Sequence, residues 1–313
     1  MDKIANKKCL VLHSNTIEMV RKEINLSRPG EMKEVINILK EWVKMQPHFK
    51  KKDFPDSYLE RCIVASKGSV EKAKNRLDKM CTMRTLMPEF FEDKDLTKDF
   101  KELFETVILT ICPKLTKEHQ RVFVIKAYKN PSSSKLFTTF FKYGVYLAEY
   151  ERKYDYIAGF RIVYDFRNLD LINFVSKLNI VETRHAVSLF MQGYGLKIKG
   201  IHIISDSKGV DLFVNIIKQI LKPKLASRIS THKTFEEIHD IVGKDVLPAE
   251  LGGYERPIKE IHEDWIAELG TEENMEYMRE MNKAGTDETL RSRDKFNEDY
   301  AGMPGTFRVL SLD

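Results

Sequence analysis

The stretch of sequence that decides the fold is Lys197-Ile198-Lys199-Gly200-Ile201-His202-Ile203-Ile204, a short run dominated by isoleucine. Two similar runs of β-branched and aromatic residues precede it, at residues 121–126 and 158–165. Apolar-rich stretches of helical length, residues 136–150 and 171–194, separate the three runs. Strands that alternate with helices in this way are typical of an α/β layer whose strands run largely parallel.

The sequence after the third run continues this pattern. Its apolar residues predict a further amphipathic helix over residues 209–221, and residues 229–232 are expected to form a short last strand. Pro248 and Gly252-Gly253 then end the compact part. We therefore expect an α/β domain over residues 111–268, followed by an acidic helix and tail over residues 269–313 that pack on it.

The N-terminal third has a different pattern. Between residues 31 and 44, apolar residues recur at three- and four-residue steps, which is the period of one buried helix face. Ser57-Tyr58-Leu59-Glu60 has the form of a capping box that opens a second helix, and residues 70–80 form a third helical face. One more helix is expected over residues 96–110. Residues 1–110 therefore predict a small all-helical domain without strands.

Length and composition exclude several classes of protein. The 313 residues are enough for about two structural units of roughly 150 residues each. Apolar runs never approach the roughly 18 residues that a membrane span needs, and the charged start Met1-Asp2-Lys3-Ile4 predicts no signal peptide, so we expect a cytoplasmic protein. Cys9, Cys62, Cys81 and Cys112 are scattered without a CxxC pair, which argues against a disulfide or zinc scaffold.

The formal net charge of +5 hides an asymmetry along the chain. Residues 1–196 contain 35 Lys and Arg against 25 Asp and Glu, residues 197–233 contain 8 against 2, and residues 234–313 contain 9 against 20. The middle segment is therefore the densest in positive charge. Such a segment is usually a solvated face, but a short dense one can also dock an anionic partner.

No set of residues has the spacing of an active site. The chain lacks a GxxxxGK[ST] loop, a GxSxG elbow and an HExxH motif. Asp165 is the best lone acid, yet an Asp at the end of a strand commonly hydrogen-bonds the turn that follows it. His202 lies inside a strand run, where a histidine is more often satisfied in the core than used as a base or ligand. We therefore expect no enzyme activity, no cofactor and no metal site.

Two predicted helices carry more apolar residues than a surface helix needs. Residues 136–150 are apolar around most of the circumference, and residues 210–221 show the same excess. A helix that is apolar on several sides lies inside a core or lines a cavity. Core packing explains each helix alone, but together the two helices allow an internal apolar pocket.

Several motifs occur in a fixed order along the chain. The strand run and its amphipathic helix are followed by Leu221-Lys222-Pro223-Lys224-Leu225-Ala226-Ser227-Arg228-Ile229 and by Val246-Leu247-Pro248-Ala249-Glu250-Leu251-Gly252-Gly253. Two further motifs lie upstream at a spacing that fits the same pattern, namely Glu71-Lys72-Ala73-Lys74 and Pro88-Glu89-Phe90-Phe91. Over residues 32–265, the set resembles the CRAL-TRIO lipid-binding family, and within it the tocopherol and retinaldehyde carriers.

The resemblance implies a helical N-terminal domain followed by an α/β domain. In this family a mixed sheet floors a hydrophobic pocket, and an amphipathic lid helix, which matches residues 209–221, closes it. Phe140 and Gly144 stand where the tocopherol carrier has serines, which argues against tocopherol itself as the ligand. The positions that the resemblance assigns to the pocket wall are Phe140, Tyr143, Gly144, Leu147, Ile162, Tyr164, Phe174, Leu178, Val187, Phe190, Ile203, Phe213, Ile217 and Ile220.

The resemblance also gives the basic segment a meaning. In the tocopherol and retinaldehyde carriers, a basic cleft binds phosphoinositide head groups. The alternative is a set of ordinary solvated side chains. The residues at or beside the matching positions are Lys197, Lys199, Lys218, Lys222, Lys224 and Arg228.

The expected function is that of an intracellular carrier for a small hydrophobic lipid, which is tocopherol-, retinoid-, carotenoid- or otherwise terpenoid-like. Its partners would be this lipid and, transiently, an anionic membrane surface, not nucleic acid. The alternative is a sensor whose lipid occupancy regulates a protein partner. The acidic region with Glu272-Glu273, Glu276, Glu280 and the terminal Phe307-Arg308-Val309-Leu310 would be the partner surface in that case.

Overall fold

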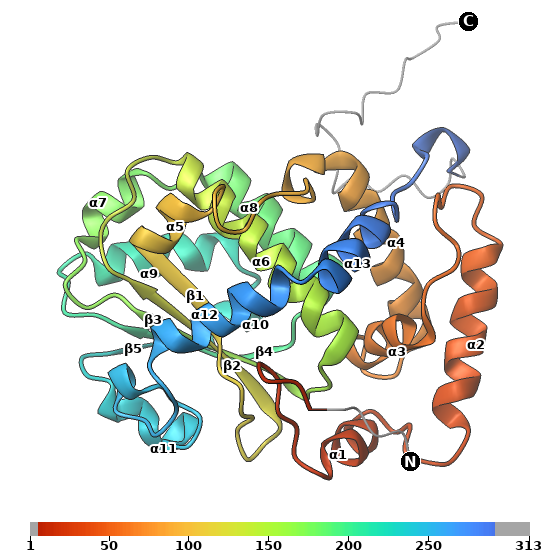
Figure 1. Ribbon diagram of the computed structural model, residues 1–313, viewed down its shortest axis with the longest axis horizontal. Coiled ribbons are helices and arrows are strands. Elements are labelled where there is room, and N and C mark those ends of the chain that lie inside the picture. Colours follow the sequence, from red (N-terminus) through yellow and green to blue (C-terminus); the bar gives the residue numbers. More distant parts are fainter. Residues whose placement is uncertain (1–5, 292–313) are drawn as a thin grey trace, which may run out of the picture.

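The computed structural model describes residues 6–291, which fold into a helical N-terminal part and an α/β part (Figure 1). The N-terminal part contains α1 (Thr16–Glu23), α2 (Glu31–Lys44), α3 (Asp56–Ala65) and α4 (Val70–Leu86). The apolar stripe predicted for residues 31–44 faces the core of this part. Its buried residues on α2 are Met32, Ile36, Leu39 and Val43.

Five strands form one mixed sheet, and their order in the sheet is their order in the sequence. At one edge, β1 (Val107–Ile111) lies antiparallel to β2 (Gln120–Ala127). Parallel to β2 and to one another follow β3 (Gly159–Asp165), β4 (Ile198–Ile204) and β5 (Ile229–His232). The fold class and the strands predicted from the sequence are therefore confirmed, and β1 is an addition.

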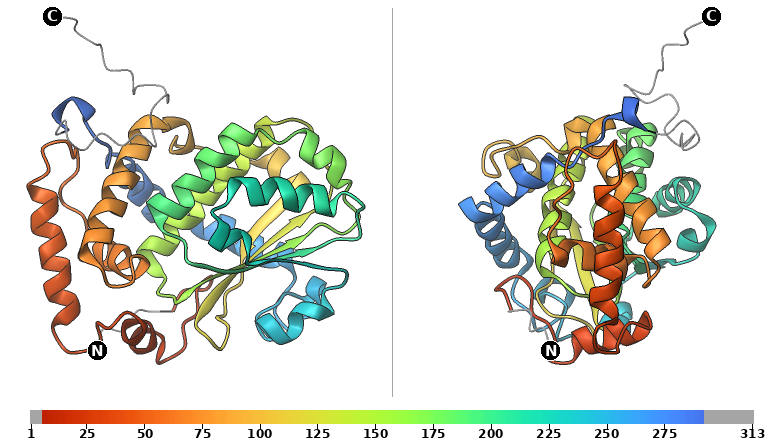
Figure 2. Two further views of the ribbon diagram at one scale, coloured as in Figure 1. Left: turned by 180° about the vertical axis from the view of Figure 1, so that it is seen from behind. Right: turned by 90° about the vertical axis from the view of Figure 1, so that its right-hand side faces the viewer.

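Helices cover one face of the sheet, namely α6 (Lys135–Tyr154), α7 (Leu171–Ser176), α8 (Ile180–Ser188) and α9 (Val210–Ile220) (Figure 2). The opposite face is covered by α11 (His239–Val242) and the segments beside it. Within residues 6–291, no helix is both long and apolar enough to cross a membrane. The remaining helices are α5 (Lys101–Thr106), α10 (Pro223–Ala226), α12 (Ile258–Leu269) and α13 (Glu272–Asn282), with 3-10 turns at Pro88–Phe90, Glu236–Ile238, Ala249–Leu251 and Glu288–Leu290 and the π-helical turn η2 at Leu189–Tyr194.

Three local predictions were wrong. Residues 96–110 form only the short α5, because Val107–Ile111 pairs with β2 and becomes a strand. Residues 171–194 are divided into α7, α8 and η2, since Asp170 and Asn179 each cap a new helix start. The capping box at Ser57 does not form, because the N-cap is Pro55 and α3 begins at Asp56, two residues earlier than the box requires.

Alternation along the strands produces a separate core on each face of the sheet. Phe123 and Ile125 of β2 and Tyr164 of β3 face the helices α6–α9. Val124 and Val163 face the opposite way, toward α11. The inner strands are therefore buried on both faces, which explains their nearly continuous apolar runs.

A buried ion pair joins the helical part to the α/β part. Arg84 of α4 donates to the carboxylate of Glu149 on α6, and both side chains are fully buried. The Tyr194 hydroxyl donates to the same carboxylate oxygen at 2.7 Å. One turn further along α6, Arg152 donates to the Tyr194 carbonyl and lies over the ring of Tyr58. These contacts fix α6 against α3 and α4.

All four cysteines are free and buried. Burial raises the pKa of Cys9, Cys81 and Cys112 to about 12, and it also raises the pKa of Cys62. Because the thiolate is the reactive form of cysteine, these thiols remain unreactive at neutral pH.

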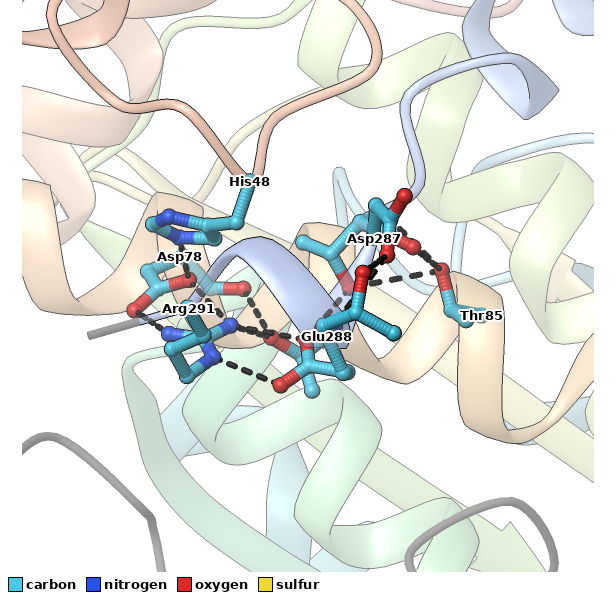
Figure 3. Close-up of polar contacts among 9 residues, drawn as sticks. His48, Asp78, Thr85, Asp287, Glu288 and Arg291 are labelled. Atoms are coloured by element: carbon cyan, nitrogen blue, oxygen red, sulfur yellow. Dashed lines mark hydrogen bonds and ion pairs between the residues drawn. The ribbon is translucent and has the colours of Figure 1, made fainter. Parts of the chain in front are cut away.

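The C-terminal segment returns to the helical part of the protein (Figure 3). Arg291 pairs with Asp78 of α4 and with Glu288, each at 2.6 Å. His48 Nε2 lies 3.0 Å from the same Asp78 carboxylate. The described end of the chain is therefore held on α4. Residues 292–313, which include Phe307–Leu310 of the expected partner surface, lie outside the described residues.

Asp78→Asn is expected to lower the free energy of unfolding by about 1–3 kcal/mol, because hydrogen bonds to a charged group are lost. Burial raises the pKa of Asp78, but the hydrogen bonds from His48 and Arg291 outweigh burial and hold this pKa below 3.8. An unfolded Asp binds its proton at higher pH, so the contribution is complete above about pH 5 and is lost as pH falls through the folded pKa.

Urea unfolding of wild type and Asp78→Asn at pH 7 and at pH 3.5 measures this effect. Glu41→Gln, which removes an exposed pair with Lys44, is the control and should cost less than about 0.5 kcal/mol. A cost for Asp78→Asn that is the same at both pH values would contradict the prediction.

Candidate functional site

A cavity of about 110 Å³ lies between the sheet and the helices α6–α9. It is smaller than the roughly 300–1,000 Å³ of typical ligand pockets, so a lipid can enter only if α9 or the aromatic side chains move. Most lining side chains are apolar. They are Leu103, Thr106, Val107, Ile125, Ala127, Lys129, Pro131, Leu136, Phe137, Phe140, Phe141, Tyr164, Phe166, Phe174, Leu178, Thr183, Phe213 and Ile217.

Aromatic rings from the strand β3, its following loop and three helices meet at this cavity. Phe166 lies 5.2 Å from Tyr164, 5.3 Å from Phe213 of α9 and 5.4 Å from Phe174 of α7, measured between ring centroids. Phe137 of α6 lies edge-on to Phe174 at 5.1 Å. Such contacts allow small ring movements at little cost, because edge and tilted geometries are both favourable.

The structure brings part of the predicted pocket wall to the cavity. Of the predicted positions, those that line it are Phe140, Tyr164, Phe174, Leu178, Phe213 and Ile217. Tyr143, Leu147 and Ile203 are fully buried in the surrounding core, and Ile162, Val187, Phe190 and Ile220 are half-buried outside the cavity wall. Tyr143 faces away from the cavity, toward Phe104 and His262.

Gly144 explains why Phe190 is not at the cavity. A Cβ atom at position 144 would come within 2.9 Å of the Phe190 ring. The absence of a side chain there lets this ring pack directly on α6, where it also stacks against Tyr194 at 5.9 Å. The Phe190 ring thus occupies space beside Gly144 that a smaller side chain at position 190 would leave open.

The prediction missed Leu136, Phe137 and Phe141 of α6, because it took the cavity wall from residues 140–147, about one turn further along the helix. Leu136, Phe137 and Phe141 have the spacing of one helical face with Phe140, and this signal was available in the sequence. Ile125 and Ala127 were missed as well, although they alternate with Phe123 on one face of β2.

The amphipathic helix α9 closes the cavity on its outer side. Phe213 and Val214 are buried, whereas Leu212 on its outer side is exposed. α9 packs against α7 and α8, each of which also exposes a large apolar residue, Ile172 and Val181. This edge of the molecule therefore presents apolar side chains to solvent beside the cavity.

The predicted basic residues lie in different environments. Lys199 pairs with Glu23 of α1 at 3.2 Å, and Arg228 donates to the backbone carbonyl of Ile198. Lys197 turns inward. The exposed members are Lys218, Lys222 and Lys224, which lie on or between α9 and α10.

Lys197 reaches a second cavity, of about 70 Å³, between α3, the end of α6 and the start of β4. Its Nζ atom is buried, and no described residue forms a hydrogen bond with it. Burial lowers the pKa of Lys197 to about 8. Glu151 lines the same cavity, and burial raises the pKa of this carboxyl well above its ordinary value. Both groups are therefore shifted toward their neutral forms.

The lone acid and the strand histidine have structural partners. Asp165 accepts hydrogen bonds from Lys126 at 2.6 Å and from both Nε and Nη2 of Arg167. His202 is buried between Arg161 and His232, and burial lowers its pKa to about 4. The described part of the chain contains no cluster of three or more His, Cys, Asp or Glu side chains that could hold a metal ion.

The fold and the cavity agree with the family comparison. Residues 105–253 match the CRAL/TRIO domain, and residues 28–100 match the Pinta-like UBA domain. The chain therefore contains a CRAL/TRIO domain over residues 105–253, as the resemblance predicted.

Similarity to individual proteins is distant. The chain is 22% identical over 246 residues to the alpha-tocopherol transfer protein-like protein of Mus musculus, which covers 77% of this chain and 71% of that protein. The Homo sapiens protein of the same name is 22% identical over 202 residues, which is 63% of this chain and only 58% of the human protein. Among solved structures, the crystal structure of Sfh5 matches with a TM-score of 0.49 and 12% identity, over 87% of this chain and 98% of that one.

Lys197→Met is expected to stabilise the protein at pH 7 by about 1–3 kcal/mol, because a buried, unpartnered ammonium is removed. The folded pKa of about 8 lies below the unfolded value. The unfolded state therefore binds more protons between about pH 8 and pH 10.4, and wild-type stability rises with pH in that window. The advantage of the variant should shrink between pH 7 and pH 9.5 in urea unfolding.

Lys222→Met is the control for this test, because Lys222 is exposed. It should leave stability and its pH dependence unchanged. An advantage of Lys197→Met that is constant with pH would show that the gain comes from packing and not from the charge.

Proposed function

We propose that the protein is a carrier that holds a small terpenoid-like lipid in the cavity beneath α9 and delivers it at membranes. The observation that supports this most directly is the aromatic cavity itself, enclosed between the sheet and an amphipathic helix within a CRAL/TRIO domain. The relatives named for tocopherol transfer support the same class of ligand. The proposal includes no catalytic step, since Asp165 is held in ion pairs.

A bound lipid would leave such a site slowly in water. Burying about 400 Å² of apolar ligand surface is worth on the order of 10 kcal/mol before the costs of association. Release would therefore need a surface into which the ligand can pass without meeting water. A membrane is such a surface. We further propose that the protein acts in the cytoplasm, where it would meet the cytoplasmic faces of membranes.

The exposed apolar edge beside the cavity suits contact with a membrane. Ile172, Val181 and Leu212 lie on three helices that pack together around the cavity. An amphipathic helix can transfer its apolar face into the interface of a bilayer. Movement of α9 toward the membrane would then open the cavity at the surface that receives the lipid.

The exposed lysines support the same orientation. Lys218, Lys222 and Lys224 continue from α9 into α10. Each basic residue near an anionic bilayer contributes about 1 kcal/mol of attraction. We propose that these residues, together with Arg228 and Lys199, bind anionic lipid head groups, including phosphoinositides.

Lys222→Ala combined with Lys224→Ala is expected to slow ligand transfer to vesicles that contain phosphoinositide by about tenfold or more, because about 2 kcal/mol of attraction is lost. Affinity for the ligand in solution should not change, since neither residue lines the cavity. Transfer of a fluorescent lipid between vesicles measures the effect. Lys33→Ala with Lys52→Ala, at exposed positions of the helical part, is a control that removes the same charge. An equal loss of transfer rate in the control would show that the effect comes from net charge and not from these two positions.

Leu212→Asp is expected to weaken association with neutral vesicles, because it places a charge where an apolar side chain would enter the interface. Leu212 is exposed in the closed structure, so folding should be unaffected. Co-sedimentation with vesicles measures binding, and thermal unfolding checks the fold. Met45→Asp, at an exposed apolar position on the helical part, is the control. Unchanged sedimentation of Leu212→Asp would show that α9 is not part of the membrane contact.

A further inference from the structure

The cavity wall contains few polar groups, and most of them are already engaged. The hydroxyls of Thr106 and Thr183 donate to backbone carbonyls four residues earlier in the chain, at 2.9 and 2.7 Å. Lys129, at the rim, lies 3.8 Å from the carboxylate of Glu105. The two threonine donors are therefore already used, whereas Lys129 keeps N–H donors free at the exposed rim.

Tyr164 differs from the other polar wall residues. It lies on the cavity-facing side of β3, and no described residue forms a hydrogen bond with its hydroxyl. Burial alone raises its pKa to about 12, since no charged group contributes. The phenol is therefore a neutral donor at physiological pH. Tyr164 is half-buried and its hydroxyl lacks a protein acceptor, so a bound ligand can supply that acceptor in place of water.

The surroundings of Tyr164 restrict what that acceptor can be. Its ring contacts Phe166 and Phe213, and its neighbours in the sheet are Ile125 and Ile203. A carboxylate or phosphate placed here would lose its hydration without gaining a cation. A single uncharged oxygen on an apolar skeleton loses much less.

We propose that Tyr164 donates a hydrogen bond to one neutral oxygen of the bound ligand, which makes the ligand an apolar alcohol or ketone and not a fatty acid, a phospholipid or a pure hydrocarbon. This assignment rests on the proposed carrier function, because it uses the same cavity. It names the chemistry by which that cavity distinguishes among hydrophobic molecules of similar size.

The test uses three ligands with the same fifteen-carbon skeleton: farnesol, the hydrocarbon farnesene and farnesoic acid. Each displaces N-phenyl-1-naphthylamine, an apolar fluorophore, from the full-length wild type and from Tyr164→Phe. The variant is expected to bind farnesol about tenfold more weakly, the factor that one hydrogen bond supplies. Its affinity for farnesene should be unchanged. Wild type should bind farnesoic acid more weakly than farnesol.

Tyr143→Phe is the matched control, because Tyr143 is a buried tyrosine of the same domain that faces His262 and not the cavity. It should alter neither affinity. A second readout uses geranylacetone, whose carbonyl stretch should lie at lower frequency in wild type than in Tyr164→Phe. This shift reports the hydrogen bond itself, which a purely structural role for Tyr164 would not produce.

The outcomes separate this inference from the function on which it rests. Displacement by farnesene together with equal farnesol affinities in wild type and Tyr164→Phe would overturn the inference alone. Farnesoic acid binding more tightly than farnesol would do the same. Failure of all three ligands to displace the fluorophore would overturn the proposed carrier function and this inference with it.

Discussion

The structure depends on how α6 is held, and the buried ion pair between Arg84 and Glu149 holds it. Two charges removed from water are costly unless they compensate each other, and loss of one partner would leave the other buried and unpaired. The pair therefore fixes the position in which α6 packs against the helical N-terminal part. Because the opposite side of the same helix carries Phe137 and Phe140, the position of the cavity wall follows from a contact outside the cavity.

This double role explains the unusual composition of α6. Its apolar residues serve the cavity on one side and a second core on another, where Tyr143 packs among Phe100, Phe104 and His262. The sequence shows that the helix is apolar around most of its circumference, and this correctly predicted that it is enclosed. It does not show which apolar stripe meets which neighbour, because that depends on tertiary contacts, such as the one with His262 of α12, far away along the chain. The cavity wall was therefore assigned to residues 140–147 of α6, whereas the structure places it at residues 136–141.

The same limit applies to the sheet and to the basic residues. β2, β3 and β4 were predictable because each is a compact run of β-branched residues, whereas β1 directly follows α5 and is defined by its pairing with β2. The lysines and arginine of residues 197–228 were predicted as one basic surface from their order in the sequence. Their orientation is set by tertiary contacts, which bury Lys197, pair Lys199 with Glu23 and bond Arg228 to the backbone. Of the six predicted residues, only Lys218, Lys222 and Lys224 face solvent without such a partner among the described residues.

The buried cysteines have a practical consequence for studying motion in this protein. None of the four thiols is exposed, and burial keeps each of them protonated at neutral pH. Maleimide reagents attack the thiolate, so the folded wild-type chain should be nearly silent toward them. A single cysteine introduced at an exposed position of α9 could then carry a spectroscopic label without removal of any native residue. The native thiols would therefore not interfere with distance measurements between α9 and the core.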